Sequence, residues 1–196
     1  VQAQLENAHA LGICVASIGE SGVPLDCTGT PCFPSIAWFD ERTLPQTAWW
    51  EDKMGKREVF QNTGLSLSHI FSLNKLVWLR SHEPKAFART RRWLCISDYI
   101  AYCLCGEQAM GYSLASRTMA FNPLTARWST NMLAAANISE QLWPQPLQEG
   151  SLLGKVLPKI ANSLPMLYET PVFVGGHDHV VASLAVGAIE SGIMID

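Results

Sequence analysis

The sequence has few charged residues and no long apolar run. Charged side chains make up 16% of the 196 residues, and the formal net charge is −3. There is no basic stripe, which argues against nucleic acid as the main partner. No apolar segment reaches the roughly 18–20 residues that a bilayer-spanning helix needs, so we expect no membrane partner.

An internal repeat, a low-complexity linker and a signal-peptide layout at the first residues are also missing. The six cysteines follow no disulfide-framework spacing, and we expect them to be reduced core thiols of a cytoplasmic protein. Hydrophobic residues make up 48% of the chain, which is typical of a well-buried globular domain.

Apolar patterning predicts short strands and amphipathic helices along the whole chain. The predicted strands cover 10–16, 23–26, 35–39, 155–157, 172–174 and 193–196. The predicted helices cover about 47–61, 71–87 with an interruption near Pro84, 91–104 and 129–137, with a helical turn at 159–164. A last helix is predicted from the end of the His-Asp-His turn to about Glu190. The glycine-containing turn between the second and third strands predicts an antiparallel hairpin over 23–39. Segments 112–121 and 142–150 are expected to be irregular.

The segment Val174-Gly-Gly-His-Asp-His179 places three titratable side chains between a predicted strand and a predicted helix. In open α/β folds, ligands bind at the carboxyl ends of the strands. Asp178 is therefore our first candidate for a catalytic residue, and its structural alternative is an N-cap of the following helix. We expect Gly175 and Gly176 to let a ligand approach the backbone.

The same segment also permits a metal-dependent hydrolase as an alternative. On an extended strand, His177 and His179 would point to one side and could both bind a metal ion. A closed metal site needs further ligands, and no H-x-x-E-H-type motif provides them. We therefore predict no metal ligands among the site residues.

Several segments of this chain resemble, in order, segments of a known family. They are Leu11-Gly-Ile13, Ile36-Ala-Trp-Phe-Asp-Glu-Arg-Thr43, Thr63-Gly-Leu65 with Lys75 and Trp78-Leu79, Ser97-Asp-Tyr-Ile100 with Leu104-Cys-Gly-Glu107, Ser113-Leu-Ala-Ser-Arg-Thr-Met-Ala-Phe121 with Trp128, and Val174–His179. The family is the FGGY family of carbohydrate kinases, which includes xylulokinases, gluconokinases and glycerol kinases. Six matches in one order, over nearly the whole chain, make the resemblance specific.

The resemblance implies an α/β fold of the ribonuclease H-like, actin–hexokinase type, with a mixed sheet flanked by helices and incomplete at both ends. Residues 1–196 look like part of the N-terminal, sugar-binding domain of a two-domain kinase. The Asp-x-Gly-Thr-type phosphate loop of such kinases is absent from this sequence, as is a second, nucleotide-binding domain. We therefore expect the isolated segment to be inactive.

The implied reaction is ATP-dependent phosphorylation of a sugar or polyol hydroxyl, with Mg²⁺ bound with the nucleotide. Asp178 matches the catalytic base of the family, and a carboxylate suits proton acceptance in phosphoryl transfer. The resemblance leaves a homodimer open. A second interpretation of the chain is a non-catalytic sugar-binding or assembly module.

The same resemblance implies a set of sugar-binding residues. Trp38 could place an apolar ring against the C–H face of a sugar. Asp40 and Arg42 could bind hydroxyls, or could pair with each other. Glu20 is the candidate in the turn 17–22, and His179 stands where relatives have an amide side chain. This turn differs from the corresponding loops of relatives, and Ile70 replaces a tyrosine of glycerol kinases, so the sequence does not identify the sugar.

Overall fold

The computed structural model describes residues 9–188 as short strands and helices. The strands are β1 (Ile13–Cys14), β2 (Gly22–Leu25), β3 (Arg92–Cys95), β4 (Ala109–Gly111), β5 (Phe121–Asn122), β6 (Arg127–Trp128), β7 (Gln145–Leu147), β8 (Leu152–Lys155) and β9 (Pro171–Phe173). The α-helices are α1 (Leu44–Lys53), α2 (Lys56–Thr63), α3 (Ser72–His82), α4 (Pro84–Arg89), α5 (Ile96–Cys105), α6 (Tyr112–Ala115), α7 (Thr130–Ala136), α8 (Pro158–Ala161) and α9 (Asp178–Ala185). The predicted strand 193–196 lies outside the described residues.

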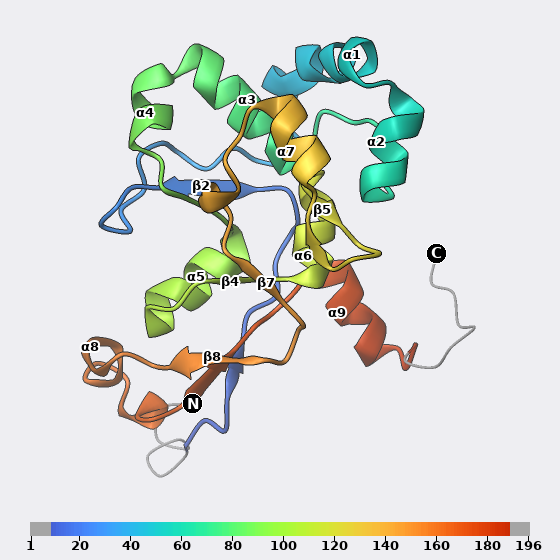
Figure 1. Cartoon of the computed structure of the whole chain (residues 1–196). Helices are drawn as coiled ribbons and strands as arrows, with labels where there is room; N and C mark the ends of the chain where they lie inside the picture. Colours follow the sequence, from blue (N-terminus) through green and yellow to red (C-terminus); the bar gives the residue numbers. More distant parts are fainter. Residues whose placement is uncertain (1–8, 189–196) are drawn as a thin grey trace.

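A mixed sheet with the order β1-β9-β8 lies at one end of the molecule (Figure 1). β9 is its central strand; it runs parallel to β1, with Ile13 opposite Val172, and antiparallel to β8. Helix α5 covers this sheet through a small apolar cluster that includes Ala101, Cys105 and Val172. The strands predicted at 10–16 and 172–174 thus pair with each other, although they are far apart in sequence.

The predicted hairpin over 23–39 is confirmed only as two isolated antiparallel bridges, Leu25 to Pro31 and Gly22 to Ile36. Residues 35–39 form no strand. The ladder of β2 is with β3 instead, antiparallel, with Gly22 opposite Cys95. Gly22 suits the actual partner, because an added Cβ would lie 2.2 Å from the Trp93 ring, which is fully buried.

The predicted helix 91–104 is wrong in its first part, because Arg92–Cys95 is strand β3 and the helix begins at Ile96. The predicted helix 47–61 is two helices, which Gly55 separates with a φ of 84°. Both supposedly irregular segments contain regular structure: α6 and β5 in 112–121, and β7, parallel to β4, in 142–150. The edge strand expected at 155–157 lies at Leu152–Lys155 instead.

The local signals for helix ends are confirmed. The chain breaks between α3 and α4 at Glu83, directly before Pro84. Gly106 ends α5 in the left-handed region, as a glycine C-cap does. Ser129 is the N-cap of α7, and its hydroxyl accepts a hydrogen bond from the Met132 backbone N–H.

The main apolar core lies under the helices at the other end of the molecule, where α1–α4 and α7 gather (Figure 1). Its largest members are aromatic or long aliphatic side chains. They include Trp50, Phe71, Leu73, Leu76, Trp93, Met110, Leu114, Phe121, Trp128, Met132 and Trp143. No helix among residues 9–188 is both long and apolar enough to cross a bilayer.

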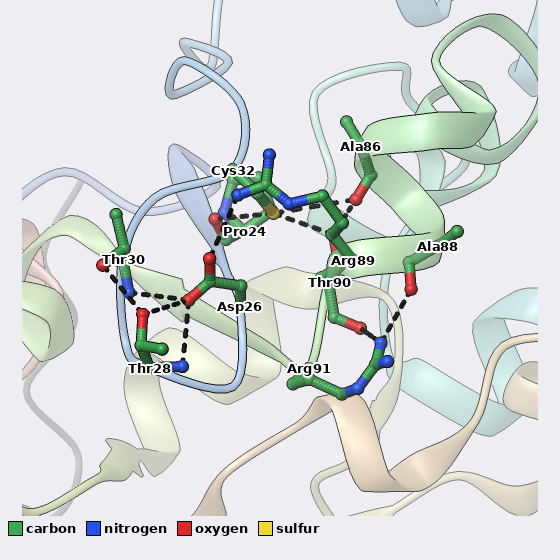
Figure 2. A network of polar contacts seen from close by, with 10 residues as sticks. All are labelled: Pro24, Asp26, Thr28, Thr30, Cys32, Ala86, Ala88, Arg89, Thr90 and Arg91. Atoms are coloured by element: carbon green, nitrogen blue, oxygen red, sulfur yellow. Dashed lines mark hydrogen bonds and ion pairs between the residues drawn. The ribbon is translucent and has the colours of Figure 1, made fainter.

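A polar network fixes the turn after β2 to the end of α4 (Figure 2). Asp26 Oδ1 accepts hydrogen bonds from the backbone N–H groups of Thr28 and Thr30 and from the Thr28 hydroxyl, and Oδ2 lies 3.1 Å from Arg89 Nη2. The Thr28 bonds, with help from Arg89, hold the pKa of Asp26 far below its ordinary value. The network therefore stabilises a loop that carries none of the predicted site residues.

All six cysteines are unpaired, but most are not in the core. Cys95 and Cys105 are buried, Cys32 is half-buried, and Cys14, Cys27 and Cys103 are exposed. The prediction of free thiols therefore agrees with the structure, while the prediction of core positions is wrong for the three exposed residues.

Candidate functional site

Parallel pairing of β1 and β9 brings the segments that follow them together. The pairing continues beyond both strands in a parallel bridge between Ser17 and His177. The Asp178 backbone N–H donates to the Ser17 carbonyl at 3.0 Å, and the Ser17 N–H donates to the Gly176 carbonyl at 3.3 Å. The carboxyl ends of the two strands therefore form one edge, where α/β folds place their ligands.

Asp178 lies at this edge as the first residue of α9. Its carboxylate Oδ1 accepts the His179 backbone N–H at 2.8 Å, and 37% of the side chain is exposed. His177, not Asp178, is the N-cap residue, so the N-cap alternative for Asp178 is wrong. A carboxylate in the first turn is stabilised by the helix dipole and still faces solvent.

Gly175 and Gly176 are required by the protein itself rather than by a ligand. An added Cβ at Gly175 would lie 1.8 Å from the Val15 carbonyl oxygen, and one at Gly176 would lie 2.7 Å from Ser113 Oγ. The same hydroxyl accepts the His177 backbone N–H at 2.9 Å. Neighbouring chain segments therefore fill the space of a Cβ and fix the turn before Asp178, while the approach of a ligand to these glycines stays a prediction.

A cavity of about 220 Å³ opens beside Asp178. It is lined by Ile18, Gly19, Glu20, Trp38, Ile70, Arg117, His177, Asp178 and His179. Four predicted site residues, Glu20, Trp38, Asp178 and His179, thus meet at one cavity. Asp40 and Arg42 do not line it.

Glu20 is buried and has a φ of 62°, which is uncommon for a residue with a side chain. Its carboxylate Oε1 accepts a hydrogen bond from Arg117 Nε at 2.6 Å. Its backbone carbonyl accepts one from Lys75 Nζ at 2.5 Å. Strained backbone of this kind persists only where its surroundings fix it, and two cations do so here.

Trp38 lies in an irregular segment and not in the predicted strand. Its backbone N–H donates to Ser21 Oγ at 2.9 Å, which ties it to the loop of Glu20. The side chain is 45% exposed and meets Phe39 edge to face, with ring centroids 5.6 Å apart. An exposed indole at a cavity edge can offer its face to an apolar surface of a ligand.

Asp40 and Arg42 pair with each other. Arg42 Nη2 lies 2.8 Å from Asp40 Oδ2, Arg42 Nε donates to Oδ1 at 2.9 Å, and the guanidinium lies over the Trp78 ring. The Arg42 hydrogen bond lowers the pKa of Asp40. Asp40 is also the N-cap of a short 3₁₀-helix. Of the two interpretations of these residues, the structure shows mutual pairing. Their contact with a sugar stays a prediction.

The two histidines differ in their surroundings. The His177 ring packs against Gly19, where an added Cβ would lie 2.9 Å from it. Burial lowers the pKa of His177, and the nearby Asp178 and Glu20 partly oppose this shift. The His179 side chain is 86% exposed. At neutral pH, His177 is therefore a neutral imidazole in the cavity wall.

Arg117 and Lys75 were missed as functional residues. Arg117 lines the cavity next to Glu20, and its guanidinium lies 5.4 Å from the centroid of the Phe71 ring. Fully buried Lys75 also donates to the Ile70 carbonyl at 2.7 Å. Both residues occur in the segments that resemble the carbohydrate kinase family. For Lys75, a charged residue inside the apolar pattern of a predicted helix was the available signal.

Comparisons with known proteins define the class. Residues 1–185 match the model of the FGGY family of carbohydrate kinases, N-terminal domain. The chain is 30% identical over 184 residues to a xylulose kinase of Lactococcus lactis, covering 93% of this chain and 36% of the relative. It is 26% identical to an L-fuculokinase of Haemophilus influenzae, covering 96% of this chain and 40% of the relative.

The fold agrees with that of a solved relative. A xylulose kinase of Rhodospirillum rubrum superposes with a TM-score of 0.87 at 25% identity, over 94% of this chain and 38% of that chain. The fold is therefore that of sugar kinases, of the actin–hexokinase type, with a mixed sheet and flanking helices. The chain belongs to the FGGY family of carbohydrate kinases. It spans about a third of the length of the curated relatives that it matches.

Proposed function

We propose that this chain is part of the sugar-binding domain of a kinase that transfers the γ-phosphate of ATP to a hydroxyl of a sugar or polyol. The observation that supports this proposal most directly is the cavity at the carboxyl ends of β1 and β9. Glu20, Trp38, Asp178 and His179 all line it. This arrangement combines polar groups, an aromatic face and an accessible carboxylate, as sugar sites do. The family membership supports the reaction class.

In the proposed reaction, Asp178 accepts the proton of the attacking hydroxyl. The carboxylate faces the cavity, and the backbone bond to Ser17 fixes its position. Phosphoryl transfer needs mainly positioning and charge stabilisation from a protein, together with a group that orients or deprotonates the nucleophile. A carboxylate in the first turn of a helix that is partly exposed to the cavity can act in this way.

The sugar is proposed to lie between Trp38 and the Glu20–Arg117 pair. The indole would contact C–H groups, while Glu20, Arg117 and His179 would bind hydroxyls. Among the described lining residues, the one permanent cation, Arg117, is already paired with Glu20 and is not available to an acidic ligand. We therefore expect an uncharged sugar or polyol rather than an acidic one. Sugar contact by Asp40 and Arg42 remains a proposal that their mutual pairing does not support.

ATP and Mg²⁺ are the expected cosubstrate and metal of the complete kinase. Mg²⁺ prefers several oxygen ligands. Among the described cavity residues, Glu20 is held by Arg117, which leaves Asp178 as the available carboxylate. These residues do not fit a Mg²⁺ site of their own, and the sequence has no Asp-x-Gly-Thr loop. We therefore assign no residue of this chain to the nucleotide and propose that other parts of the kinase bind it.

We infer that the complete enzyme is cytoplasmic, acts on a small molecule and does not bind nucleic acid. A homodimer is the oligomeric state that the family resemblance allows. The non-catalytic binding module is the alternative if no form of the protein phosphorylates a sugar.

The test replaces Asp178 by asparagine in a form of the protein that shows sugar-dependent ATP consumption. Asparagine keeps the shape and the bond to the His179 N–H but cannot accept a proton. General-base catalysis typically contributes 10²- to 10⁴-fold, so turnover should fall by roughly that factor, while the Kd for the sugar changes little. Asp52→Asn is the matched control, because it changes an exposed aspartate on α1 that does not line the cavity. Near wild-type turnover of D178N would falsify the assignment.

A further inference from the structure

Three possible metal ligands lie together at the cavity edge. The ligating atoms of His177, Asp178 and His179 all lie within 4.8 Å of one another. His177 Nε2 is 3.6 Å and His179 Nε2 is 4.0 Å from Asp178 Oδ1. The two imidazole rings meet edge to face, with centroids 4.8 Å apart. The carboxylate thus lies within reach of a nitrogen from each ring.

Two of these residues are fixed, and the third can move. The His177 backbone is held by Ser113 Oγ, and the Asp178 backbone by the Ser17 carbonyl. The His177 ring packs against Gly19 in the cavity wall. The His179 ring is 86% exposed, so it can rotate about its side-chain bonds without displacing a neighbour.

We propose that His177, Asp178 and His179 form a binding site for a divalent transition-metal ion such as Zn²⁺. Zn²⁺ binds imidazole nitrogen and carboxylate oxygen at about 2.0–2.2 Å, so ligands around a tetrahedral ion lie roughly 3.3 Å apart. Only a small closing movement is needed, and His179 is free to make it. Two histidines and one carboxylate favour Zn²⁺ and its neighbours over Mg²⁺, which prefers oxygen ligands.

The site differs from the metal pair that the sequence suggested. The histidines do not lie on an extended strand: His177 is the N-cap of α9 and His179 is its second residue. The additional ligand is Asp178 itself, between them. An ion with three protein ligands has one tetrahedral position left, which a water molecule can fill.

The metal site goes beyond the proposed function and does not depend on it. One consequence does rest on that function: an ion bound through Oδ1 of Asp178 occupies the carboxylate that should accept the substrate proton. Such an ion would inhibit phosphorylation and compete with the sugar for the cavity. Asp178 would then act as the catalytic base when sugar is bound and as a metal ligand when the ion is bound.

The experiment titrates ZnCl₂ into this chain by calorimetry in a non-chelating buffer, with excess Mg²⁺ present. We expect one ion per chain for the wild type. His179→Asn and Asp178→Asn should each weaken binding by at least about tenfold, since even outer-shell changes cost 10- to 100-fold at metal sites. His82→Asn is the matched control because it changes an exposed histidine elsewhere, and it should bind as the wild type does.

Cysteine is the competing ligand, so the same titration is repeated with Co²⁺ and followed by absorption. Ligation by histidine and aspartate gives d–d bands without an intense sulfur-to-metal charge-transfer band. Such a charge-transfer band, binding that His179→Asn leaves unchanged, or no binding at all would overturn the proposal. Circular dichroism is the check that the variants are folded. We expect His179→Asn to fold normally, because the His179 side chain is exposed. An inactive kinase with an intact metal site would refute only the proposed function.

Discussion

Lys75 is a fully buried ammonium group that holds two cavity segments together. Its Nζ donates to the carbonyls of Glu20 and Ile70, and both residues line the cavity. Burial lowers the pKa of Lys75 to about 8, against the opposing charges of Glu20 and Asp40. We infer that Lys75 is a positioning residue: it fixes the strained backbone at Glu20 and does not touch the substrate.

Lys75→Met should therefore weaken sugar binding, because Met fills the space but leaves both carbonyls without a donor. We expect the Kd for the sugar to rise about tenfold or more, in line with the loss of a charged hydrogen bond. Lys56→Met, at an exposed lysine, is the matched control and should bind normally. Unchanged binding by K75M would show that the Glu20 loop keeps its conformation without the lysine.

The same variant gives a pH test with a definite sign. An unfolded lysine has a pKa of about 10.4, so between pH 8 and 10.5 the unfolded chain binds more protons at Lys75 than the folded chain does. Stability then rises with pH in this window and is constant below it. The free energy of unfolding of the wild type, relative to K75M, should rise by an amount on the order of 3 kcal/mol. Denaturant titrations from pH 7 to 11 measure this difference in the free energy of unfolding. If the difference does not change with pH, the pKa of Lys75 is not lowered in the folded chain.

Residues with a local signal could be predicted, and residues with distant partners could not. Asp178 and His179 follow a strand and two glycines, so their place at a strand end was predictable. The role of Arg117 depends on Glu20, 97 positions away. Lys75 binds main-chain carbonyls, which leave no mark in the sequence. Asp40 and Arg42 form an ion pair with each other, and the sequence alone does not tell whether such residues pair or bind a ligand.

At the scale of elements, the pairing of β1 with β9 positions the site, and Gly175 allows it. The Val15 carbonyl leaves no room for a Cβ there. Gly175→Ala should lower the free energy of unfolding by about 2–4 kcal/mol, because backbone rather than a flexible side chain must move. Gly154→Ala is the matched control in the same sheet, since its Cβ would meet only side-chain atoms, at 3.3 Å. Thermal and denaturant unfolding of both variants measure the loss of stability. An equal loss in the two variants would contradict the special steric demand at Gly175.

Element types were predictable where a cap or a breaker marks them. Pro84, Gly106 and Ser129 gave correct boundaries because their backbone chemistry acts locally. Strand partners were not predictable in the same way. β2 forms its ladder with β3, about 70 residues away, and only isolated bridges with the segment that follows it. Gly22 leaves room for the Trp93 ring of β3. Short apolar runs such as Arg92–Cys95 carry no period that separates a strand from a helix.

At the scale of the whole molecule, this chain matches only part of the length of its relatives. It spans 36% of the Lactococcus lactis xylulose kinase and 40% of the Haemophilus influenzae L-fuculokinase. The cavity lies within the described residues, but no residue of this chain is assigned to ATP. We therefore expect that sugar binding and ATP consumption can be separated in this 196-residue chain.

The 196-residue chain alone should bind sugar weakly and consume no ATP in response to it. Trp38 provides the probe: it is half-exposed at the cavity edge, so a bound sugar should change its fluorescence, and Trp38→Phe should remove that change. Coupled detection of ADP, with the same panel of neutral sugars and polyols, should give no signal above the sugar-free rate. Sugar-dependent release of ADP by this chain would mean that its own residues bind the nucleotide, and the proposed division of labour would be wrong. A fluorescence change that Trp38→Phe abolishes, without ADP release, would place the sugar in this cavity and agree with the proposed division of labour.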